Sequence, residues 1–112
     1  MNLFNWQTQL RKGLLEVVVL NLLRHGRRHG YEMAQIFKRI DALKVREGNL
    51  YPILYRLQVD GLIKSYTERS QDGPPRKYFE LTKLGQKTLK DMNVHFEQLI
   101  GGIDQIKKGT CL

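Results

Sequence analysis

The sequence predicts a mainly helical α+β fold. Apolar residues recur at intervals of three and four over most of the chain, which is the period of a helix buried on one side. After Gly61 the period changes to two in a pair of short segments separated by a turn, which indicates two strands. The chain has 112 residues, a length that allows one modest core but not two independent ones.

Two helices are predicted in the first part of the chain. The first runs from Trp6 to His25, and its apolar stripe is wide enough to predict burial on most of its circumference. Two glycines and the basic cluster Arg27-Arg28-His29 interrupt the pattern, and we expect a solvated loop or a distal phosphate contact there. The second helix runs from Tyr31 to Ile40 and is expected to bury Met33 or Ala34, Phe37 and Ile40.

The third predicted helix, Asn49–Gly61, separates an inward face from an outward one. Its apolar stripe consists of Leu50, Ile53, Leu54 and Leu57. Tyr55, Pro52 and Val59 lie opposite this stripe, with Asn49 and Arg56 on one flank and Tyr51 on the other. Pro52 is expected in the first turn, where its missing N–H does little harm, and Gly61 is expected to end the helix.

Two strands and a last helix complete the prediction. Strands over Leu62–Arg69 and Lys77–Leu81 flank the turn Ser70–Pro75 and form a hairpin that is too small to be stable alone. Thr82 caps a last helix over Lys83–Lys107. This order predicts a winged helix-turn-helix, three helices plus a two-stranded wing, over residues 1–82, and a C-terminal dimerisation helix and tail over residues 83–112.

The last helix carries a narrow apolar seam with spacings of three and four, formed by Leu89, Met92, Phe96, Leu99, Ile103 and Ile106. This seam packs either on the first helix of the same chain or on a second copy in a homodimer. Gly101 and Gly102 interrupt the helix, so either it bends or frays there, or close packing requires the absence of side chains.

Composition and charge narrow the range of functions that the chain could have. Nineteen Lys and Arg against eleven Asp and Glu give a formal net charge of +8, which favours a polyanionic partner such as nucleic acid. No glycine-rich phosphate loop, paired metal ligands or Ser/His/Asp set is present, so we expect no enzyme activity, no metal and no cofactor. The longest apolar run, Val17–Leu20, is too short to cross a membrane, and no secretory signal is visible, so the expected location is the cytoplasm.

Five stretches form a combined pattern that covers roughly residues 11 to 90: Lys12–Leu15, Gly30–Glu32, Gly48–Leu57, Asp60–Ile63 and Arg76–Gly85. The most specific parts are Leu-Tyr-Pro on the third helix and Leu-Thr-x-x-Gly after the wing. In order and spacing, these stretches resemble the PadR-like family of transcriptional regulators.

The resemblance implies a dimeric regulator, usually a repressor, that binds double-stranded DNA. The helix Asn49–Gly61 would enter the major groove, and the wing over residues 64–80 would lie on the backbone. The residues implied to lie near DNA are Tyr31, Tyr51, Pro52, Arg56, Arg76 and Lys77. Asn49 departs from the family, because many members carry Thr or Ser there, and the operator sequence therefore cannot be transferred from relatives.

The side chains of the third helix suit DNA contact. Asn49, Tyr51, Tyr55 and Arg56 offer an amide, hydroxyls and a cation to phosphates and base edges. The tyrosines could instead be half-buried packing residues, and Arg56 could pair with Asp60. On the wing, strand alternation sends Arg76 and Lys77 to opposite faces.

Two further expectations concern partners. A homodimer would present its two recognition helices to a pseudo-palindromic operator with half-sites about one helical turn apart. Trp6 and Phe96 could line a pocket for a small aromatic effector between the subunits, although apolar stripe residues of this kind are more often plain dimer core. The alternative function is a winged-helix module that contacts protein rather than DNA.

Overall fold

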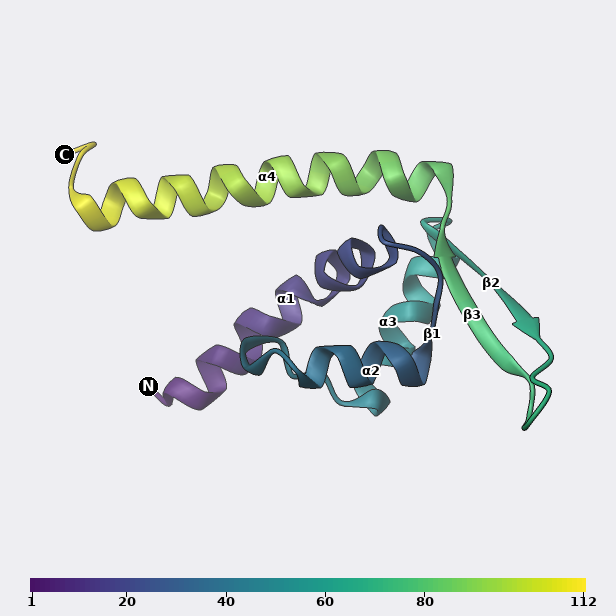
Figure 1. Cartoon of the computed structure of the whole chain (residues 1–112). Coiled ribbons are helices and arrows are strands. Elements are labelled where there is room, and N and C mark those ends of the chain that lie inside the picture. The colour runs from purple at the N-terminus through teal and green to yellow at the C-terminus, as the bar shows by residue number, and fades with distance from the viewer.

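The computed structural model describes all 112 residues. Its elements are α1 (Leu3–Leu23), β1 (Arg28–His29), α2 (Gly30–Lys38), a short 3₁₀ turn η1 (Asp41–Leu43), α3 (Glu47–Val59), β2 (Ile63–Glu68), β3 (Arg76–Leu81) and α4 (Lys83–Lys108). Three helices precede a hairpin, and a long helix follows it (Figure 1). The predicted winged helix-turn-helix fold with a C-terminal helix is therefore confirmed.

The core lies where α1, α2 and α3 meet under the hairpin. The predicted stripe of α3 is fully inside it, because Leu50, Ile53, Leu54 and Leu57 are all buried. Met33, Ala34 and Phe37 of α2 are buried as well. The expected burial of Ile40 is wrong: α2 ends at Lys38, so Ile40 leaves the helical face and is 46% exposed.

The first helix is less buried than its apolar composition predicts. Only its last turns join the core, through Val19, Leu20 and Leu23. The first half carries exposed apolar side chains at Leu3, Phe4, Trp6 and Leu10. The prediction of burial on most of its circumference is wrong for the single chain, because the first half of α1 extends beyond the helices that cover its second half (Figure 1).

The sheet has one strand more than predicted. Arg28 and His29, expected in a loop, form β1, which pairs antiparallel with β3 through Arg28–Phe79 and His29–Tyr78. The strand order is β1-β3-β2, so β3 is the central strand of a three-stranded sheet. A two-residue strand has no periodicity of its own, and only its distant partner β3 specifies it.

The first turn of α4 is held tightly against the end of α3. The Thr82 hydroxyl accepts from Gly85 N–H, as the predicted helix cap requires, and also donates to the Gly61 carbonyl at 2.6 Å. Gly61 has φ of 76°, a left-handed conformation that suits glycine. A Cβ atom at Gly85 would overlap the carbonyl oxygen of Leu62. The start of α4 therefore requires glycine at position 85.

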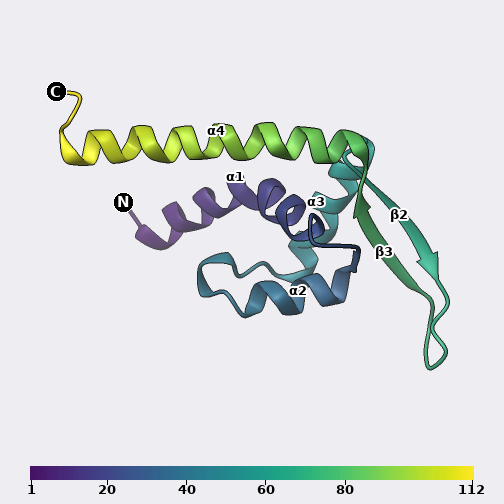
Figure 2. The same cartoon turned by 45° about the horizontal axis from the view of Figure 1, so that its top comes forward.

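Farther along, α4 is tied to α1 by two asparagines. Asn21 and Asn93 exchange side-chain hydrogen bonds of 3.0 and 2.9 Å, and Asn21 also donates to the Val17 carbonyl at 2.8 Å. Beyond this pair, α4 continues away from the rest of the chain (Figures 1 and 2). The chain is consequently elongated, with extents of 61 × 33 × 22 Å.

The predicted seam of α4 divides into two parts. Leu89 is buried in the chain's own core and Met92 packs against that core, so these two residues are not free for a partner. Phe96 is half-buried, whereas Leu99, Ile103 and Ile106 are exposed. The helix runs unbroken through Gly101 and Gly102, and Cβ atoms at either position would meet open space. No helix is long and apolar enough to traverse a lipid bilayer.

Candidate nucleic-acid interface

The start of α3 differs by two residues from its prediction, and this changes the positions of two candidates. The helix begins at Glu47, with Arg46 as N-cap and no side-chain cap bond, so Asn49 lies inside the first turn. Pro52 is then the sixth helical residue, and its predicted place in the first turn is wrong. Because proline has no N–H, the carbonyl of Gly48 four residues earlier lacks its helical partner. At the other end, Gly61 follows the C-cap Asp60, as predicted.

The outward face of α3 is aromatic and open. Tyr55 is 72% exposed, and Pro52 and Val59 are exposed beside it. In both views the start of α3 and the tip of the wing lie on the side of the molecule away from α4 (Figures 1 and 2). This side presents a helix end and a hairpin together, as groove binding requires.

Tyr51 is held in place by a glycine of α2. A Cβ atom at Gly30 would lie 2.7 Å from the Tyr51 hydroxyl oxygen and 2.9 Å from its ring, so the ring rests directly on the Gly30 backbone. The Tyr51 hydroxyl donates to Glu47 Oε1 at 3.3 Å. Burial raises the pKa of Tyr51, and the charge of Glu47 raises it further. Tyr51 therefore remains a neutral phenol in a fixed orientation, half packed and half exposed.

Gly30→Ala is expected to displace the Tyr51 ring and to weaken duplex binding roughly tenfold, about 1.4 kcal/mol. Since the ring is partly exposed, it can swing outward, and the fold should persist. Fluorescence anisotropy with a labelled duplex measures the affinity. Gly13→Ala is the matched control, because a Cβ atom there meets nothing within 4 Å. Wild-type affinity in Gly30→Ala would show that the position of Tyr51 is irrelevant to binding.

Arg56 and Asn49 lie on the other flank of α3, toward α1. Arg56 Nη1 donates to Glu16 Oε1 of α1 at 2.7 Å, so the alternative pairing with Asp60 is wrong. The two side chains of the pair stay 60% and 39% exposed, so the pair contributes little to stability. Arg56 thus joins α3 to α1 as well as facing solvent.

Arg76 and Lys77 lie on opposite faces of the wing, as strand alternation predicts. Lys77 Nζ lies 5.7 Å from the ring centre of Phe79, on the face directed toward the helices. Together with Tyr31 and Tyr51, both residues line a groove of about 310 Å³ between the wing and the first turns of α2 and α3. The fold thereby brings together four of the predicted DNA-contacting residues from three elements.

His29 links this groove to the start of α2. Its Nδ1 accepts from Glu32 N–H at 3.2 Å and so caps α2. Its Nε2 lies 2.9 Å from Arg76 Nη1. The His29 ring thereby connects the start of α2 to the wing.

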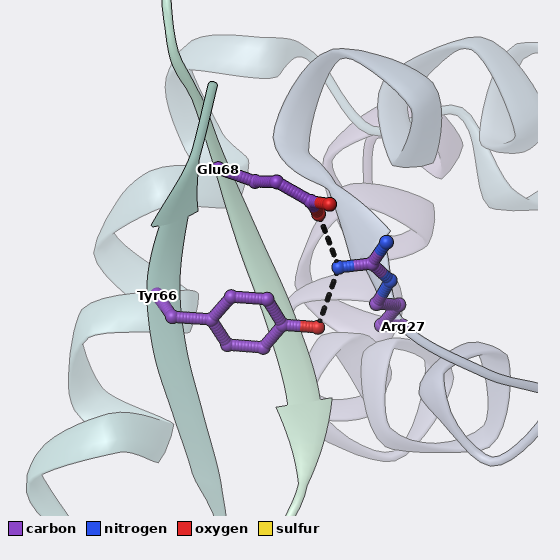
Figure 3. Close-up of polar contacts among 3 residues, drawn as sticks. All are labelled: Arg27, Tyr66 and Glu68. Atoms are coloured by element: carbon purple, nitrogen blue, oxygen red, sulfur yellow. Dashed lines mark hydrogen bonds and ion pairs between the residues drawn. The ribbon is translucent and has the colours of Figure 1, made fainter. Parts of the chain in front are cut away.

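A cluster on the outer face of the wing was not predicted. Arg27 Nη1 donates to the Tyr66 hydroxyl at 2.8 Å and pairs with Glu68, as Figure 3 shows. The Arg27 guanidinium carbon also lies 4.3 Å from the ring centre of Tyr78. The hydrogen bond from Arg27 to Glu68 raises the pKa of Arg27. These contacts join the wing to the turn after α1. Tyr66 and Tyr78, the single tyrosines of β2 and β3, pair across the two strands and contribute the aromatic part of the cluster.

Comparison with known proteins identifies the family. Residues 19–91 match the model of the transcriptional regulator PadR-like family. The chain belongs to this family. The resemblance inferred from the sequence over roughly residues 11 to 90 is therefore confirmed, and the chain is a PadR-like transcriptional regulator.

Individual relatives agree with this assignment. A transcriptional regulator of Mycobacterium tuberculosis is 34% identical over 85 residues, which cover 73% of this chain and 78% of the relative. A PadR family transcriptional regulator from Eggerthella lenta has a TM-score of 0.79 and 27% identity, with 88% of this chain and 86% of that chain covered. Bacillus subtilis PadR in complex with operator DNA has a TM-score of 0.68 and 28% identity, with 72% and 47% covered.

Proposed function

We propose that this PadR-like regulator acts as a homodimeric repressor that binds a pseudo-palindromic duplex. In each subunit the first turns of α3 enter the major groove, and the wing over residues 64–80 lies on the backbone. The observation that carries the proposal is the groove in which Tyr31, Tyr51, Arg76 and Lys77 meet. The Bacillus subtilis relative, solved with operator DNA, supports the same use of the fold.

Each DNA-facing residue receives a role from its position. Arg76 and Lys77 would contact phosphates from the wing, and the hydroxyls of Tyr31 and Tyr51 would contact the same strand from the first turns of α2 and α3. Pro52 and Tyr55, exposed on the outward face of α3, would meet the floor of the groove. Asn49 and Arg56 would face the other strand, because they occupy the α1 flank of the helix.

The dimer is inferred from apolar surface that the single chain leaves uncovered. On α4 the exposed part of the seam is Leu99, Ile103 and Ile106, and the first half of α1 adds Leu3, Phe4, Trp6 and Leu10. Exposed apolar side chains gathered along a helix mark an interface, and a helical seam is suited to another helix. In this proposal residues 1–82 bind DNA and residues 83–112 pair the subunits, with the first half of α1 adding to the paired surface.

Two further parts of the proposal depend on the dimer. A small aromatic effector would bind between the subunits beside Trp6, which is 48% exposed, and Phe96, which is half-buried. The repressor would act in the cytoplasm. Its chemistry would be binding alone, without an enzymatic step.

Selection of bound sequences from a random duplex pool tests the proposal. The expected result is an inverted repeat with half-sites about one helical turn apart, and transcription from a promoter that carries this repeat should fall when the protein is present. Failure to bind any duplex at low salt would instead favour the alternative, a winged-helix module that contacts protein. Enrichment of a single, non-repeated site would contradict the dimeric arrangement.

A further inference from the structure

A second groove lies on the α1 flank of α3, on the opposite side from the wing. It encloses about 480 Å³ between the first half of α1, the end of α2 and the segment that leads into α3. Its charged and amide side chains are Arg11, Lys12, Lys38, Lys44, Arg46 and Asn49, and its floor is apolar. We call it the α1 groove.

The charged side chains that line the α1 groove are all cationic. Five of its lining residues are Lys or Arg, and none is Asp or Glu. Only Lys44 has an acidic partner, Asp41 at 3.7 Å, and both side chains of that pair are more than half exposed. Four cations are therefore left without a carboxylate inside one concave surface. A concave surface lined by one sign of charge raises the local positive potential and attracts anions.

The position of the groove indicates the anion. The major groove of B-DNA, about 12 Å wide, is bordered by two phosphate backbones. The first turn of α3 has Tyr51, Arg76 and Lys77 on its wing flank and the α1 groove on its other flank. A helix that enters a major groove therefore has cations ready for both borders.

We infer that the α1 groove binds the backbone of the DNA strand opposite the one that the wing contacts. Its cations would neutralise successive phosphates, and its apolar residues Leu15 and Val45 would lie against the deoxyribose faces. Asn49, at the edge of this groove, would donate to the same strand. This inference rests on the proposed DNA binding and adds a second backbone contact to it.

The test removes one cation from each wall of the groove. Lys12→Gln with Arg46→Gln changes two exposed residues that take part in no ion pair. The affinity for the selected operator duplex is measured from 50 to 300 mM salt. Because each lost phosphate contact lowers the salt slope by roughly one, we expect a slope smaller by about two and an affinity for all duplexes lower by roughly 10-fold or more at low salt.

Lys87→Gln with Lys90→Gln is the matched control, since it removes the same charge from two exposed residues of α4. This control should keep the wild-type slope. An equal decrease of the salt slope in both variants would assign the effect to net charge and overturn the inference. An unchanged salt slope in the groove variant would overturn it as well. If a small organic anion weakens duplex binding by the wild type while the groove variant keeps the wild-type salt slope, the groove binds that anion instead and the inference is overturned. If the wild type binds no duplex, the proposed function itself fails.

Discussion

Replacing Leu99 and Ile103 together by Glu is expected to yield monomers that bind the operator roughly 100-fold more weakly, or worse. Both side chains are exposed in the single chain, at 55% and 45%, so the substitutions should leave its own core intact. In a dimer each would place a carboxylate in an apolar seam, where burial of an unpaired charge is costly. A monomer also loses the second half-site, and with it the gain from bivalent binding.

Sedimentation velocity reports the mass, and anisotropy with the selected duplex reports the affinity. Val94→Glu serves as the control, because Val94 is 49% exposed on α4 but lies away from the seam. It should remain dimeric and bind normally. Phe96→Glu would be less informative, since Phe96 is already half-buried in its own chain. A Leu99→Glu, Ile103→Glu double variant that still sediments as a dimer would rule out this seam.

Gly85→Ala is expected to destabilise the fold by about 1–3 kcal/mol or more. The added Cβ atom would overlap the Leu62 carbonyl oxygen and would lie 3.2 Å from Leu81 Cδ2. Backbone atoms cannot rotate away as a side chain can, so the first turn of α4 would have to separate from the end of α3. Urea denaturation followed by circular dichroism measures the loss in free energy of unfolding.

Gly101→Ala provides the same substitution in the same helix without a steric neighbour, because nothing lies within 4 Å of a Cβ atom there. It should stabilise the protein by about 1 kcal/mol, as expected for Gly to Ala in a helix. A decrease in the free energy of unfolding for Gly85→Ala and an increase for Gly101→Ala would support the contact between α4 and Leu62. Equal stability of Gly85→Ala and the wild type would contradict it.

Local signals explain what the sequence predicted correctly. The apolar stripe of α3 repeats within one helix, and the cap of α4 is a single residue, Thr82. The hairpin needs only two neighbouring strands. Each of these depends on residues close together in the chain. The alternation that separates Arg76 from Lys77 is equally local.

The errors concern contacts between distant segments. β1 exists because β3 pairs with it, although the two strands are almost 50 residues apart. Arg56 bonds to Glu16 across 40 positions rather than to the nearby Asp60. The contact between the Tyr51 ring and the Gly30 backbone, and the α1 groove, also depend on how the helices pack. Burial of α1 was overestimated because a stripe of apolar residues does not reveal whether its partner belongs to the same chain.

The amide pair Asn21–Asn93 has a mechanical consequence for α4. It is the last side-chain hydrogen bond between α4 and α1, so the helix beyond it, about 22 Å long at 1.5 Å per residue, has no further polar tie to α1. A tilt of about 5° at this pivot would move the far end by roughly 2 Å. In the proposed dimer, the same tilt would change the separation of the two α3 helices. The spacing of the half-sites that the dimer can bind would then depend on the angle at which α4 leaves its own chain.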